Sequence, residues 1–79
     1  MGTIDWAAST RYSNHLNIVT SYEEQLLQLF YGVTWDGDLI NKTERTNAVK
    51  AGHAVKSWGW NIITQEGVKF LVDTGAVVA

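Results

Sequence analysis

Polar residues with hydrogen-bond donors are concentrated between positions 42 and 56 of this sequence. Four of the basic residues fall in this stretch, against the single carboxylate of Glu44. Lysine contacts phosphates, whereas arginine pairs with guanine and asparagine with adenine at base edges. The stretch therefore predicts a nucleic-acid-binding surface whose contact residues are Lys42, Thr43, Arg45, Thr46, Asn47, Lys50 and Lys56.

A second group of residues has the composition of a protein-binding surface. Tryptophan is enriched at the centres of protein interfaces, and we expect Trp58 to project beside Lys56 while Trp60 packs inward. Acidic residues lie nearby in the sequence and could form a patch with Glu23 and Glu24 that suits a basic partner. The candidate partner-binding residues are Trp58, Trp35, Asp36 and Asp38.

Residue types that carry catalysis or bind metals are sparse and badly spaced. The two histidines, His15 and His53, are 38 positions apart with no carboxylate at a ligand spacing, and the serines stand in no nucleophile motif. There is no cysteine, which excludes disulfides and cysteine-ligated zinc. We therefore expect no enzyme activity, no cofactor and no metal.

Length and composition predict one small domain over residues 1–79, with 1–20 poorly defined. The chain has 79 residues, 46% hydrophobic and 18% charged, with a formal net charge of −2. Four tryptophans provide too much apolar surface for a disordered chain. No signal peptide or stretch of about 18 apolar residues is visible, so we expect a cytoplasmic protein with no membrane association.

Two helices with clear terminal signals are expected to position the donor residues. Ser21 and Glu24 fit a capping box for a helix over 22–31, with Leu26, Leu29, Phe30 and Val33 as its apolar stripe and Gly32 as a left-handed end. Asn41 and Gly52 fit the ends of a helix over 42–51. Its inward residues are expected to be Ala48 and Val49, supported by Leu39 and Ile40.

Downstream elements follow from glycine and threonine positions. Residues 53–57 and 60–64 alternate as a hairpin around Trp58-Gly59, and Thr64 fits the cap of a helix over 65–72 with Val68, Leu71 and Val72 buried. A last short strand is predicted over 76–78. Near the N-terminus, Thr3 could cap a short helix.

This order of elements resembles the winged helix-turn-helix family. The resemblance rests on residues 41–71: a helix running into Gly52, a strand with Lys56, a turn at Trp58-Gly59, and Ile63-Thr64-Gln65-Glu66-Gly67 at the next helix. These residues look like the second half of MarR-type regulators and are similar to small phage-encoded winged-helix proteins. The resemblance implies an α+β fold, a small winged-helix domain of helices plus a two-stranded β-hairpin wing.

The sequence departs from the family before the 42–51 helix. Only nine residues separate Gly32 from Lys42, so the first helix of the motif is either abbreviated or replaced by the 22–31 helix. Two functions are compatible with this pattern. One is a transcription regulator that binds DNA through helix 42–51 and wing 56–60, with a possible homodimer formed by the N-terminal third.

The other function is a phage-type inhibitor that binds a host transcription protein such as RNA polymerase. It would use the tryptophans and acidic residues and would act in a bacterial host cell. Net negative charge and the missing helix favour this alternative, whereas the polar composition of helix 42–51 favours DNA binding.

Overall fold

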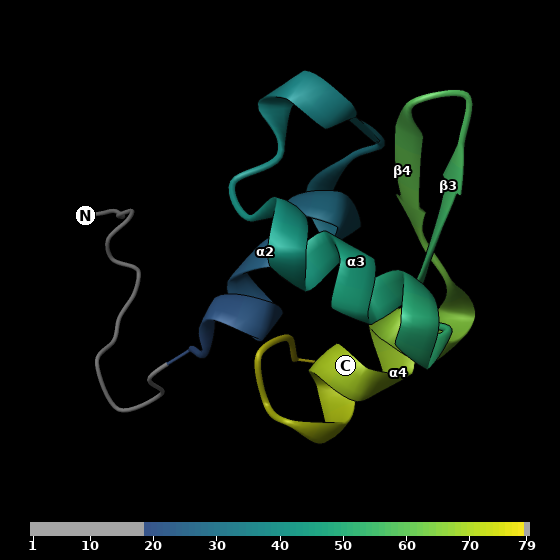
Figure 1. The fold of residues 1–79 in the computed structure, drawn as a ribbon. Helices are drawn as coiled ribbons and strands as arrows, with labels where there is room; N and C mark the ends of the chain where they lie inside the picture. The colour runs from purple at the N-terminus through teal and green to yellow at the C-terminus, as the bar shows by residue number, and fades with distance from the viewer. Residues whose placement is uncertain (1–18, 79) are drawn as a thin grey trace.

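A computed structural model describes residues 19–78 of the chain, which form a small α+β fold (Figure 1). Three α-helices and a three-stranded antiparallel sheet make up this part. In chain order the elements are α2 (Ser21–Tyr31), β2 (Thr34–Trp35), the 3-10 turn η1 (Asp36–Asp38), α3 (Lys42–Ala51), β3 (Ala54–Ser57), β4 (Trp60–Ile63) and α4 (Gln65–Asp73). The expected helix near Thr3 lies outside the described residues. No described helix has the length and apolarity that a membrane crossing requires.

Helix α2 begins one residue earlier than expected because a different capping box forms. The Thr20 hydroxyl accepts from the Glu23 amide at 3.1 Å, and the Glu23 carboxylate accepts from the Thr20 amide at 2.9 Å. The prediction of Ser21 and Glu24 was wrong by one position, since Thr20-Ser21-Tyr22-Glu23-Glu24 contains the same pattern twice. The buried Glu23 side chain makes the box that forms.

Two further expectations for α2 were wrong. Gly32 is extended, with φ 174° and ψ 152°, because the chain passes directly into β2 instead of closing the helix in the left-handed region. Of the predicted stripe, Leu26 and Leu29 are buried, but Phe30 and Val33 are exposed. Helix α2 thus packs through a narrower apolar face than its sequence indicates.

Both predicted ends of α3 are confirmed. The Asn41 side chain accepts from the Glu44 amide at 3.0 Å, and Gly52 adopts the left-handed conformation at φ 80°. Ala48 is fully buried against α2, whereas Val49 and Ile40 are exposed, contrary to expectation. A buried alanine lets the α3 backbone approach its neighbours closely, and the larger Val49 side chain next to it points to solvent.

The hairpin forms as predicted and is extended by a third strand. Its central residues Trp58 and Gly59 both have positive φ, 53° and 83°, as a type I′ turn requires. The two-residue strand β2 adds to β4, giving the order β2-β4-β3 with Thr34 opposite Asn61 and Trp35 opposite Trp60. The expected two-stranded wing is therefore part of a three-stranded sheet.

Helix α4 closes the core from below the sheet in Figure 1. The apolar core joins α2, α3, β3 and α4 through the buried residues Leu26, Leu29, Ala48, Ala54 and Leu71. Val68 and Val72 are only half-buried. Residues 76–78 form no strand; instead, the amides of Ala76 and Val77 donate to the Leu71 carbonyl and fold the chain back on α4.

Gly67 marks a close approach between α4 and the segment before β3. A Cβ at this position would overlap the His53 carbonyl oxygen and lie 2.7 Å from Cγ1 of Ile63. The contact is fixed from both sides, because the Thr64 amide donates to the same His53 carbonyl at 3.0 Å. Glycine is therefore required here for packing and not for an unusual φ angle.

We expect Gly67→Ala to lower the free energy of unfolding by about 1–3 kcal/mol through overpacking, measured by urea denaturation. Gly32→Ala is the matched control, because that glycine is extended and a Cβ added there would have nothing within 4 Å. Equal stability losses in the two variants would contradict the close approach at Gly67.

Candidate nucleic-acid interface

The outer face of α3 presents most of the predicted donor residues to solvent. Successive helix turns bring together five exposed side chains, those of Lys42, Thr43, Thr46, Asn47 and Lys50. Within residues 19–78, Lys42 and Lys50 make no ion pair. Two uncompensated ammonium groups on one helix face can contact neighbouring phosphates.

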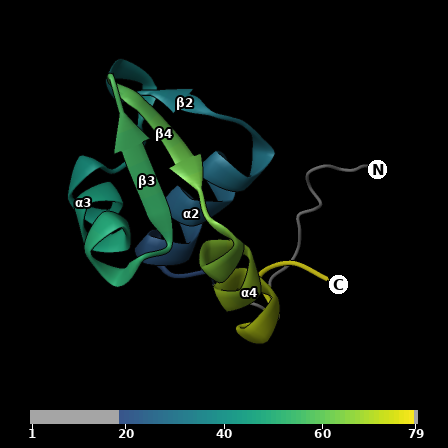
Figure 2. The same cartoon turned by 90° about the vertical axis from the view of Figure 1, so that its right-hand side faces the viewer.

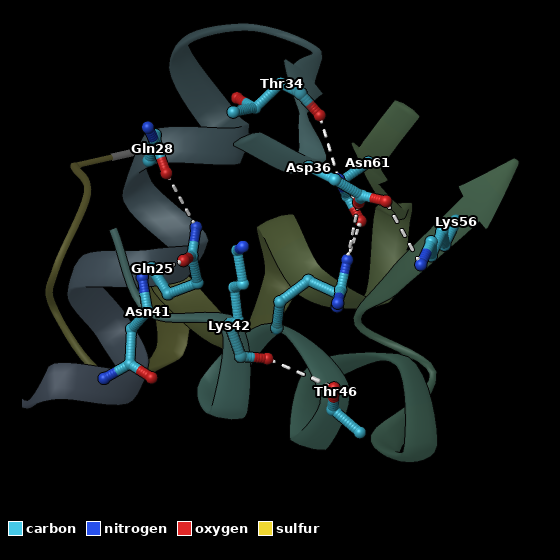
Figure 3. A network of polar contacts seen from close by, with 10 residues as sticks. Gln25, Gln28, Thr34, Asp36, Asn41, Lys42, Thr46, Lys56 and Asn61 are labelled. Atoms are coloured by element: carbon cyan, nitrogen blue, oxygen red, sulfur yellow. Dashed lines mark hydrogen bonds and ion pairs between the residues drawn. The ribbon is translucent and has the colours of Figure 1, made fainter. Parts of the chain in front are cut away.

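Two donors on this face are already partly engaged within α3. The Thr46 hydroxyl donates to the Lys42 carbonyl at 3.1 Å, which Figure 3 shows, and the Asn47 amide donates to the Glu44 carboxylate at 2.8 Å. Glu44 also accepts from the Ser21 hydroxyl at 3.0 Å, so this carboxylate faces α2. The acidic group of α3 is therefore held at the edge of the donor face.

Arg45 lies on the opposite side of α3 from the solvent-facing donors. Its side chain is only 12% exposed, and its guanidinium donates to Asp36 at 2.8 Å and to the side-chain oxygen Oδ1 of Asn61 at 2.9 Å. The prediction that Arg45 stands among exposed donors was wrong, because the helical period turns position 45 toward the sheet. Base-edge contacts would fall to Thr46 and Asn47.

Asp36 collects donors from three other elements, as Figure 3 shows for Lys56 and Asn61. Besides Arg45 from α3, its carboxylate accepts from Asn61 of β4 at 2.8 Å and pairs with Lys56 of β3 at 3.2 Å. The hydrogen bond from Asn61 and the two neighbouring cations hold the pKa of Asp36 down at about 2. Asp36 therefore stays ionised throughout the neutral range.

Asn61 is fully buried and all of its polar atoms are used. Its side-chain nitrogen Nδ2 donates to the backbone carbonyl of Thr34 at 2.9 Å and to Asp36, while its side-chain oxygen Oδ1 accepts from Arg45. A buried amide with unpaired atoms is costly, so this arrangement depends on every partner. Asp36, Arg45, Lys56 and Asn61 are called the carboxylate network below.

Two glutamines of α2 hold the connection that leads into α3. Gln25 is buried and accepts from the Asn41 amide at 2.7 Å, and its own amide donates to Gln28 at 2.9 Å (Figure 3). Gln28 accepts from the Ile40 amide at 3.1 Å and donates to the Asp38 carbonyl at 2.8 Å. Side chains thus satisfy backbone groups that a helix would have paired internally.

The three tryptophans within residues 19–78 are Trp58 at the hairpin tip and the pair Trp35 and Trp60, whose rings meet edge to face. Trp58 projects from the turn with 94% of its surface exposed, as expected. Trp60 does not pack inward: it faces away from the helices and meets Trp35 edge to face, with ring centroids 5.2 Å apart. Strand alternation explains the correction, because the buried Asn61 takes the inward position beside it.

The acidic residues do not gather into the patch that the sequence indicated. Glu23 is buried in its capping box, and the charge of Asp36 is balanced by Arg45 and Lys56 within the carboxylate network. Asp38 and Glu24 remain exposed on different elements. Of the four candidate partner-binding residues, Trp35 and Asp36 lie at the hairpin turn, where the Asp36 amide donates to the Gly59 carbonyl at 2.9 Å.

His53, the histidine within residues 19–78, belongs to a partly buried aromatic cluster. The Tyr22 hydroxyl and Nδ1 of His53 are 2.6 Å apart, and Phe70 contacts both rings. Desolvation, followed by the charge of Glu44, raises the pKa of Tyr22 above its ordinary value. Residues 19–78 contain no group of three histidine, cysteine or carboxylate side chains placed to hold a metal.

Comparisons with known proteins gave no relationship. No family model matches the sequence, and no significant match was found among curated proteins or among solved structures.

The carboxylate network predicts a specific loss of stability in acid. A lowered carboxylate pKa stabilises the fold above the unfolded value, near 3.9, and this contribution disappears as the pH falls toward about 2. We expect Asp36→Asn to be less stable than wild type at pH 6 in urea unfolding, with the difference shrinking between pH 4 and about 2. Asp38→Asn, which removes an exposed carboxylate outside the network, should parallel the wild type at every pH.

The backbone conformation of Trp58 indicates that replacing this residue can stabilise the hairpin. A bulky residue at φ 53° is strained, whereas asparagine followed by glycine is preferred in this turn. Because so little of the Trp58 side chain is buried, Trp58→Asn should raise the free energy of unfolding by about 1 kcal/mol. A loss of stability in thermal and urea unfolding would mean that the indole packs on the domain.

Proposed function

We propose that this chain is a small non-catalytic transcription regulator of winged-helix type that binds duplex DNA through α3 and the β3–β4 hairpin. The observation that carries the proposal is the outer face of α3, where five exposed donor side chains stand together and the one carboxylate of the helix is turned toward α2. A helix of this width fits the major groove of B-DNA.

The hairpin stands beside α3, where a wing would contact the adjacent backbone. Figure 1 shows the hairpin rising next to the helix, and the Lys56 ammonium reaches the same Asp36 carboxylate as Arg45 of α3. The Lys56 side chain keeps 45% of its surface exposed. It can therefore meet a phosphate while still pairing with Asp36.

The element order supports the winged-helix part of the proposal. Helix α3 ends at Gly52, the hairpin follows at once, and Thr64 begins the next helix, as in the family that the sequence resembles. The difference lies before α3, where the glutamine-held connection stands in place of a further helix. The first helix of the motif is thus replaced by α2 in this proposal.

Electrostatics set the expected strength of binding. Lys42, Lys50 and Lys56 can neutralise about three phosphates, which gives weak binding that falls steeply with salt. The net charge of −2 also limits non-specific attraction to DNA. We therefore expect measurable binding of a random duplex at low salt only.

The test is fluorescence anisotropy with a labelled random duplex, titrated from low to physiological salt. Removing one phosphate contact should reduce the slope of log affinity against log salt by about 1, so Lys50→Ala should lose one contact and Lys42→Ala with Lys50→Ala two. Lys69→Ala on α4, where Lys69 pairs with Asp73, is the control and should bind like wild type. No binding at low salt, or equal losses in all variants, would contradict the proposal.

A second candidate function is inhibition of a host transcription protein such as RNA polymerase, favoured by Trp58. A tryptophan held at a strained φ with nearly its whole surface in water has no evident role within residues 19–78. Trp58→Asn separates the candidates, since it should leave DNA affinity within about twofold but abolish inhibition of transcription by purified polymerase. No inhibition by the wild type would reject this second function, and equal inhibition by wild type and variant would reject the role of Trp58 in it.

A further inference from the structure

The sheet has its polarity inverted at the hairpin end. Cross-strand partners share a face, and the inward row Thr34, Asn61 and Lys56 is polar, whereas the outward rows are mainly apolar. In an antiparallel sheet with one face in water, the apolar residues ordinarily point to the core and the polar residues to solvent. Here the carboxylate network occupies the inner side, and the aromatic residues are on the outer side.

The outward-facing residues form one continuous surface, called the outer sheet face below. Trp35 and Trp60 contact each other across β2 and β4 and are 46% and 47% exposed. Val55 and Ile62 face each other across β3 and β4 and are 47% and 38% exposed. Figure 2 shows α2 behind the sheet and no helix in front of β3 and β4.

No charged side chain belongs to the outer sheet face. Its partner is therefore expected to be an uncharged, largely apolar surface. Besides the four apolar residues, the outward rows contain only Ser57, which lies opposite Trp60. A polyanion such as nucleic acid would find no cation there, and two copies of the face could meet without burying an unpaired charge. A two-fold dimer uses the same patch on both copies, and an uncharged patch can meet its own copy without charge repulsion.

The exposed area is sufficient for a modest homodimer. Two half-exposed tryptophans offer roughly 200 Å² together, and Val55 and Ile62 bring the apolar surface to on the order of 350 Å² per copy. Homodimer interfaces are about 65% apolar, so pairing two copies would bury about 1,100 Å² in total. That is slightly more than the roughly 1,000 Å² that a specific interface needs.

We propose that the outer sheet face is a homodimer interface in which the sheets of two copies pack against each other around Trp35, Trp60, Val55 and Ile62. The face is separate from the donor side chains of α3, so a dimer would leave both α3 helices free. This inference does not rest on DNA binding.

Sedimentation equilibrium of the full chain, without DNA, tests the dimer. We expect the average mass to rise from 8.8 kDa toward twice that value with increasing concentration, with a dissociation constant on the order of micromolar. Val55→Glu and, separately, Ile62→Glu place a charge in the interface and should each weaken the dimer at least about tenfold. Val78→Glu makes the same change at an exposed valine outside the sheet and should dimerise like wild type.

Circular dichroism confirms that each variant is folded, and the two outer-face variants provide independent readings if one of them is not. A mass of 8.8 kDa at every concentration overturns the proposal, as does equal weakening by Val55→Glu and Val78→Glu. If the chain is monomeric, urea unfolding identifies the other occupants. A large loss of stability in Val55→Glu would mean that another segment of the same chain covers the outer sheet face. No loss would mean that a different protein binds there.

Discussion

The ionised carboxylate of Asp36 is the interaction on which the rest of this fold depends. It lies where β2 enters η1 and accepts from Arg45 of α3, Asn61 of β4 and Lys56 of β3. The described apolar core is small, with five buried hydrophobic residues, and the chain has no disulfide to reinforce it. A single charged group therefore helps to fix the position of α3 relative to the sheet, because removing it would take one acceptor from the buried Asn61 amide and one from the Arg45 guanidinium.

The network also determines which side chains the sheet shows to solvent. Asn61 must point inward to reach Asp36 and the Thr34 carbonyl, and strand alternation then turns Trp60 and Ile62 outward. Trp35 follows from the register that pairs it with Trp60, and its ring lies so close to Gly59 that a Cβ there would overlap it. The outer sheet face is thus a consequence of the polar interior and is no independent feature of the strands.

Local signals in the sequence were sufficient for much of the fold. Asn41, Gly52 and Thr64 end or begin their helices as predicted, because caps act within one helical turn. The hairpin was also readable from its glycine. Predictions that depend on distant partners were wrong. The two overlapping capping boxes cannot be distinguished without knowing that Glu23 is buried, and Arg45 cannot be distinguished from a surface donor without knowing that it pairs with Asp36. Strand β2 and the roles of Gln25 and Gln28 had no local signal, since a two-residue strand and a buried amide acquire meaning only from residues 10 to 27 positions away.

The position of Arg45 changes what kind of DNA recognition α3 could support. If α3 binds DNA as proposed, the Arg45 guanidinium, which pairs best with guanine, is already occupied inside the domain, and the exposed face would offer lysines to phosphates and Thr46 and Asn47 to bases. Phosphate contacts position a protein on DNA but carry no sequence information. One copy of this domain would therefore bind with little discrimination, and selectivity would have to come from two α3 helices held at a fixed spacing. Pairing through the outer sheet face would leave both α3 helices exposed. In that arrangement the sheet would serve dimerisation and α3 would remain available for DNA.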